Sequence, residues 1–126
     1  MRKFALIVMP LMLVLALGFA ACGKGGTSSA NNGTVQLTSD NFAVNSATIN
    51  AGQSITFVDP SSATLHILCI GQDMKCSGAA GPDALTNGHQ LTINQGESKS
   101  VAFPTKGDYS ITCTVHSNMN MVVHVQ

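Results

Sequence analysis

Short runs of alternating apolar and polar residues, each ended by a turn signal, recur through residues 34–126, and none has the period of an amphipathic helix. Ile55 and Phe57 share one face of such a run, as do Val101 and Phe103, and this alternation is typical of strands with one buried face. Residues 64–70 are apolar on both faces, which predicts a central strand. The other expected strands are residues 35–37, 42–49, 91–93, 109–113 and 121–125, with a long connection at 71–88. The pattern predicts an all-β sandwich.

The N-terminal residues 1–21 have the features of an export signal. Arg2 and Lys3 precede an almost wholly apolar run, and small residues stand directly before Cys22. This arrangement resembles a bacterial lipoprotein signal, which implies cleavage before Cys22 and lipidation of its sulfur. An uncleaved membrane anchor is the alternative. Residues 22–33 are rich in Gly, Ser and Asn and predict a flexible tether, so either outcome would hold a domain of residues 34–126 on the extracytoplasmic face of the membrane.

Length and charge limit the functions open to this domain. The 126 residues are enough for one domain and not for two, and we expect a monomer. Beyond residue 22 there are four lysines and six acidic residues, which give a net charge near −2. Aromatic residues make up only 5% of the chain. With neither a basic patch nor many stacking side chains, the sequence does not predict a nucleic-acid-binding protein.

The cysteines divide into a pair and a remainder. If Cys22 is lipidated, three cysteines are left in an oxidising compartment, and an odd number leaves one thiol unpaired or bound to something. Cys69 and Cys76 flank a short turn-like segment that a disulfide could close. Cys113 would then be the free thiol. Pairing of Cys113 with one of the other two is the alternative, because connectivity cannot be deduced from sequence.

Cys113 begins a nine-residue segment that also contains His116, Met119 and Met121. A thiolate, an imidazole and a thioether differ in softness, which suits a metal that moves between a soft monovalent and a harder divalent state, and copper is that metal. Two His and one Cys with a long, weak Met bond form the arrangement of copper electron-transfer sites. The segment provides three of these four ligands, so a second His is needed from elsewhere in the chain.

The spacing Cys113-x2-His116-x4-Met121 resembles the copper loop of the cupredoxins, in particular of the plastocyanin and pseudoazurin branch. Residues 49–57 and 107–113 are similar to two framework segments of the same family. The resemblance implies a Greek-key β-sandwich that binds one copper ion, carries single electrons between redox proteins and is not an enzyme.

Four histidines compete for the remaining ligand position. The resemblance favours His66, which lies far upstream of Cys113 in the expected central strand. His89 lies in a polar turn, and His124 alternates with valines and is expected to point away from the core. Met121 is the favoured axial ligand because it shares a face with the valines of the last strand. Met119, between two asparagines, is the alternative axial ligand and is expected at the surface.

Two positions depart from the family pattern. Ile67 follows His66 where cupredoxins commonly have Asn, and Val115 precedes His116 where many have Pro. These changes leave open how the two ligand segments are held together. A reduced Cys69 would offer a second thiolate, and hence a zinc or copper-storage site. The competing functions are a copper-delivery lipoprotein and a metal-free structural sandwich.

Overall fold

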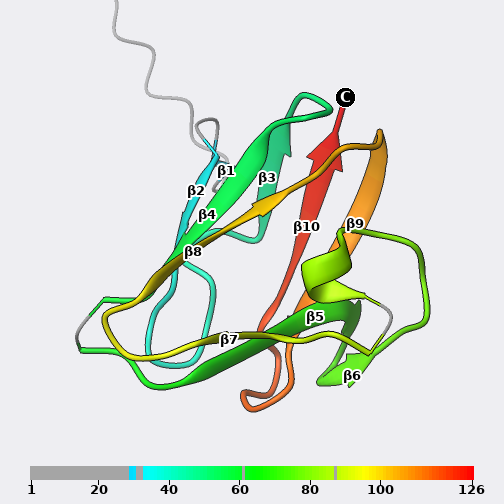
Figure 1. Cartoon of the computed structure of the whole chain (residues 1–126). Coiled ribbons are helices and arrows are strands. Elements are labelled where there is room, and N and C mark those ends of the chain that lie inside the picture. Colours follow the sequence, from blue (N-terminus) through cyan, green and yellow to red (C-terminus); the bar gives the residue numbers. More distant parts are fainter. Residues whose placement is uncertain (1–28, 31–32, 61, 87) are drawn as a thin grey trace, which may run out of the picture.

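The computed structural model describes residues 29–30, 33–60, 62–86 and 88–126 (Figure 1). The expected signal of residues 1–21 and the lipidation site Cys22 lie outside the described residues. The elements, in chain order, are β1 (Ser29–Ala30), β2 (Thr34–Gln36), β3 (Ser46–Ile49), β4 (Ser54–Val58), β5 (His66–Gln72), β6 (Lys75–Cys76), the short 3₁₀ helix η1 (Asp83–Leu85), β7 (Leu91–Ile93), β8 (Ser98–Ala102), β9 (Gly107–Cys113) and β10 (Asn120–Val125).

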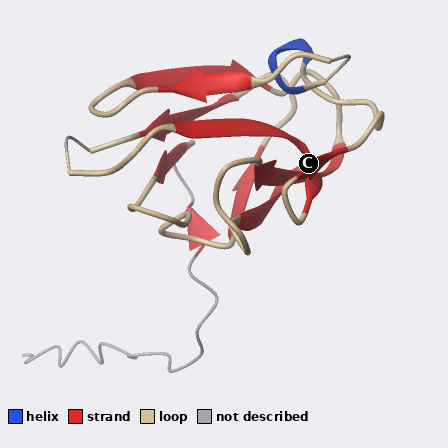
Figure 2. Cartoon of the chain, turned by 90° about the horizontal axis from the view of Figure 1, so that it is seen from below, coloured by secondary structure: helices blue, strands red, loops and turns tan. Residues whose placement is uncertain are grey.

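Two sheets face one another, as Figures 1 and 2 show, so the expected all-β sandwich is confirmed. The larger sheet has the order β1-β3-β10-β9-β5-β6, with β7 also paired to β5, and the smaller sheet has the order β2-β4-β8. The chain passes repeatedly between the sheets: β3 and β4 belong to different sheets, and β8 lies in the smaller sheet while β7 before it and β9 after it lie in the larger one. The central position expected for residues 64–70 is confirmed, since β5 pairs with β9, β7 and β6.

Alternating side chains from both sheets fill the space between them. Ile55 and Phe57 of β4 are fully buried. Val101 in β8 and Phe103 just after β8 are also buried. In β10 every second residue is buried, namely Met121, Val123 and Val125. The burial of these apolar faces is the main force that holds the sheets together.

Three elements were not expected from the sequence. Ser29–Ala30 pairs with β3 although it falls within the expected tether of residues 22–33, so sheet pairing reaches into that segment. The other two unexpected elements, the strand β6 and the helix η1, lie within the expected connection at 71–88. All three are short and lack periodicity, so backbone pairing and tertiary contacts define them rather than side-chain pattern. No helix within the described ranges is long and apolar enough to cross a membrane.

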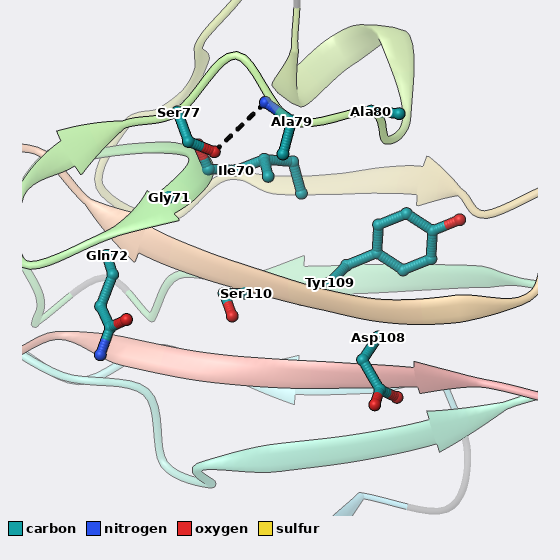
Figure 3. A pocket seen from close by; sticks show the side chains of 9 residues that line it. All are labelled: Ile70, Gly71, Gln72, Ser77, Ala79, Ala80, Asp108, Tyr109 and Ser110. Atoms are coloured by element: carbon teal, nitrogen blue, oxygen red, sulfur yellow. Dashed lines mark hydrogen bonds between the residues drawn. The ribbon is translucent and has the colours of Figure 1, made fainter.

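A pocket of about 290 Å³ opens beside β5 and β9 (Figure 3). Ile70 and Tyr109 provide apolar surface there, and the amide of Ala79 donates a hydrogen bond to the Ser77 hydroxyl. Asp108 on its rim is paired with His124, at 2.7 Å. None of the side chains that line this pocket belongs to the cluster described next.

Candidate metal centre

His66, Cys113 and His116 lie together at one end of the sandwich, although 47 positions separate the first two. His66 begins β5, Cys113 ends β9, and His116 lies in the loop between β9 and β10, at the end opposite the C-terminus in Figure 1. Leu68 of β5 pairs with Cys113, and alternate residues of a strand share a face, so His66 lies on the same face as the thiol. Within the described part of the chain, this is the one cluster of three or more His, Cys, Asp or Glu side chains with metal-binding spacing.

The donor atoms of this cluster fit one metal ion. The Nδ1 atoms of His66 and His116 lie 3.9 Å and 3.5 Å from the Cys113 sulfur, and all three donors lie within 4.8 Å of one another. Bonds of about 2.0 Å to nitrogen and 2.3 Å to sulfur, opened to about 120°, would separate N and S by about 3.8 Å. A mixed thiolate and imidazole set suits copper. The residues present therefore fit a copper ion with little rearrangement.

The hydrogen bonds of His116 orient its ring for metal binding. The hydroxyl of Thr64 donates to the carbonyl oxygen of Ser39 at 2.9 Å and lies 3.1 Å from Nε2 of His116. Because the Thr64 hydroxyl proton already forms the hydrogen bond to Ser39, the Thr64 oxygen can only accept a hydrogen bond from Nε2 of His116. The proton of the neutral ring therefore lies on Nε2, and the lone pair of Nδ1 faces the Cys113 sulfur.

His66 is enclosed more tightly, beside a buried carboxylate. Its Nε2 lies 3.8 Å from Oδ2 of Asp59, and neither side chain is exposed to solvent. Burial lowers the pKa of His66, which the nearby Asp59 opposes, and the ring is therefore kept neutral as a ligand must be. Burial also raises the pKa of Asp59, against the opposing influence of His66 and then His116.

Both methionines of the loop are buried. Met119 has no exposed surface and Met121 is 2% exposed, so the expectation that Met119 lies at the surface is wrong. The chain reverses at Asn118, whose φ of 62° lies in the left-handed region that Asn tolerates well. Met119 thereby joins the inward face of β10, and its carbonyl accepts a hydrogen bond from the amide of Cys113 at 3.0 Å.

A backbone hydrogen bond joins the two ligand segments at position 67, where this chain has Ile in place of the Asn common in cupredoxins. The amide of Thr114 donates to the carbonyl of Ile67 at 2.9 Å, which ties the residue after Cys113 to the residue after His66. Such a bond needs no particular side chain. The segments are therefore connected even though position 67 is not Asn.

A disulfide-closed hairpin adds a second connection to the loop. Cys69 and Cys76 form a disulfide, and Cys113 is the free cysteine of the described residues. Between the paired cysteines, the amide of Asp73 donates to the Asn120 side chain at 3.0 Å, and the Asn120 amide group donates back to the Asp73 carboxylate at 2.9 Å. With its sulfur in the disulfide, Cys69 offers no second thiolate, which removes the basis of the zinc alternative.

The other two histidines lie elsewhere. His89 is exposed in the loop after η1, and His124 points outward from β10 toward Asp108. Sequence reasoning missed Asp59 and Thr64. Asp59 directly precedes a proline, a sequence typical of turns, and no local pattern marks either residue as a neighbour of a ligand.

Comparisons with known proteins identify the family of the chain. Residues 30–126 match the sequence profile of the family described as copper binding proteins, plastocyanin/azurin family. The chain is 32% identical over 111 residues to the chloroplastic plastocyanin of Tetradesmus obliquus, covering 85% of this chain and 74% of that protein.

Solved structures share the fold at lower identity. Amicyanin from Paracoccus versutus (Thiobacillus versutus) superposes with a TM-score of 0.54 at 16% identity, covering 74% of this chain and 79% of that one. The copper-containing nitrite reductase of Thermus scotoductus SA-01 gives the same TM-score at 19% identity, over 74% of this chain and 22% of the enzyme. Together with the match over most of its length, these findings show that the chain belongs to the plastocyanin/azurin family of copper-binding proteins: it is a cupredoxin, with one copper ion as its cofactor.

Proposed function

We propose that this protein is a mononuclear copper electron carrier in which His66, Cys113, His116 and Met119 hold the ion. The observation that carries the proposal is the convergence of two Nδ1 atoms on the buried Cys113 sulfur, at 3.9 Å and 3.5 Å. Bound copper supplies one-electron chemistry by alternating between its monovalent and divalent states. The chain provides the thiolate, the two neutral imidazoles and a thioether, held by adjoining strands of one sheet.

Strand register supports Met119 rather than Met121 as the axial ligand. Asn120 pairs with Thr112 and Met121 pairs with Ile111 in the antiparallel ladder of β9 and β10. Met119 is therefore level with Cys113, and directly opposite residues share a face of the sheet. Met121 lies two residues farther from the metal end, roughly 7 Å along the strand. The earlier preference for Met121 considered only which face the residue occupies, and both methionines occupy the inward face.

Exposed apolar side chains around the site support docking of a redox partner. The exposed large apolar residues of the described part are Leu65, Met74 and Val115. Leu65 and Val115 directly precede the two histidine ligands, and the amide of Met74 donates to the hydroxyl of Thr112, next to Cys113. His116 is only partly buried, unlike His66 and Cys113. Electrons would therefore enter and leave through the edge of His116.

The site has the character of a carrier rather than an enzyme. Four protein donors leave no open position for a substrate, and catalytic metal sites keep one. The N-terminal signal and Cys22 support an extracytoplasmic, lipid-anchored location in which the domain acts as a monomer between a donor and an acceptor protein.

Reconstitution with Cu(II) tests the proposal. We expect an intense visible absorption from thiolate-to-copper charge transfer, reversible oxidation and reduction, and one copper per chain. Cys113→Ser should abolish the absorption, whereas Cys69→Ser/Cys76→Ser should retain it, because those sulfurs are not donors. A colourless protein that binds only Cu(I) would support copper delivery instead. Unchanged metal content in Cys113→Ser would indicate a structural sandwich.

A further inference from the structure

Asp59 is a buried carboxylate whose oxygens lack a hydrogen bond in the part of the chain that the structure describes. Its side chain has no exposed surface, and neither Oδ1 nor Oδ2 has a hydrogen-bond partner within the described residues. The same holds for Nε2 of His66, 3.8 Å from Oδ2. Buried polar groups without partners are rare, because each carries the full penalty of desolvation. Three such atoms side by side, behind a proposed copper ligand, require an explanation.

The tautomer of His66 explains why these unpaired atoms lie side by side. Its Nδ1 faces the Cys113 sulfur at 3.9 Å, so a metal held there leaves the ring proton on Nε2. The resulting N–H lies beside the carboxylate of Asp59. A separation of 3.8 Å is too short for an intervening water, since two hydrogen bonds of about 2.8 Å span more than 4 Å. A movement of about 1 Å would bring the two atoms to hydrogen-bond distance.

The backbone fixes Asp59 in this place. Its amide donates to the carbonyl of Glu97 at 2.8 Å, directly after the last paired residue of β4. Among the described residues, the ionisable groups that act on the carboxylate are His66 and His116, and no lysine or arginine of that part of the chain does so. The carbonyl of Thr38 also acts on the His66 ring and is the competing acceptor.

We propose that Asp59 is a positioning residue of the copper centre, which accepts the Nε2 proton of His66 and places a negative charge behind this ligand. The inference rests on the proposed function, since it assigns His66 Nδ1 to the metal. A carboxylate behind a ligating imidazole fixes the ring orientation and makes the ligand more basic. It also favours the divalent over the monovalent ion, because the extra positive charge is attracted to it at low dielectric.

Asp59→Asn tests the inference, since it keeps the shape of the side chain and removes its charge. We expect the reduction potential of the copper-loaded variant to rise by at least about 59 mV, which is a tenfold change in the ratio of Cu(I) to Cu(II) affinity. Asp108→Asn is the matched control, because that carboxylate is 73% exposed and pairs with His124. Its potential should stay at the wild-type value. Equal potentials in Asp59→Asn and wild type would overturn the inference and assign the Nε2 proton to Thr38.

A second measurement does not depend on copper or on the folding of the variant. The ¹⁵N spectrum of His66 in the metal-free wild-type protein should show a proton on Nε2 that exchanges slowly with water, and an unprotonated Nδ1. The reverse tautomer would overturn the inference. Failure of the proposed function is distinguishable, because it would appear as the absence of visible absorption in the copper-treated wild type, while the spectrum of His66 would still report which ring nitrogen carries the proton.

Discussion

The two buried methionines of the copper loop allow a matched test of the axial ligand, by Met119→Leu and Met121→Leu. Met119, directly before β10, and Met121, on the inward face of β10, are 0% and 2% exposed. Met-to-Leu exchange nearly conserves volume and generally costs under about 1.5 kcal/mol in a core. Both variants should therefore fold, with similar losses of stability, so that each controls for the other.

The expected difference is electronic. Met119 is level with Cys113, while Met121 is paired with Ile111 and lies roughly 7 Å farther along the strand. Replacing the axial thioether by a hydrocarbon removes a donor and lowers the polarity at the metal, which disfavours the more highly charged Cu(II). We expect Met119→Leu to raise the reduction potential by about 60–120 mV, a ten- to hundredfold change in relative affinity, and Met121→Leu to shift it by less than about 20 mV.

Voltammetry of the copper-loaded proteins measures the potentials, visible spectra report the thiolate bond, and urea unfolding of the metal-free forms compares stability. A large shift in Met121→Leu with none in Met119→Leu would refute the register argument and restore Met121 as the axial ligand. Equal small shifts in both would show that neither thioether contacts the metal.

Two further perturbations probe the hairpin that contacts the loop. Removing the disulfide with Cys69→Ser/Cys76→Ser should lower the free energy of unfolding by about 2 kcal/mol, because the unfolded chain is no longer constrained by a closed loop with a sequence separation of 7. Urea unfolding measures this loss, and an unchanged midpoint would contradict it. Asn120→Ala removes the reciprocal bonds with Asp73 and should cost about 1 kcal/mol while broadening the distribution of copper environments seen by EPR. An unaltered EPR spectrum would show that the hairpin does not restrain the metal site.

Local patterns identified much of the fold and brought Cys113 and His116 to attention, whereas the choice of His66 rested on the family resemblance. Alternation at Ile55, Phe57, Val101 and Phe103 predicted strands with the correct inward faces, since the pleat places every second side chain on one side. Patterns failed where elements are too short to have a period. This is why the sequence predicts a loop where β6 and η1 form, and why it does not predict the pairing of Ser29–Ala30 with β3.

The sequence alone determined that Cys113 and His116 offer a thiol and an imidazole to one site, because they stand three residues apart and this spacing is a covalent property of the chain. The burial of Met119 and its position level with Cys113 were decided by the register of β9 and β10, which hydrogen bonds between the strands determine. The positions of Asp59 and Thr64 behind the two histidines were likewise decided only by tertiary packing. Local sequence specifies which donors a segment offers, whereas neighbours brought together by non-local strand pairing specify how those donors are oriented and charged.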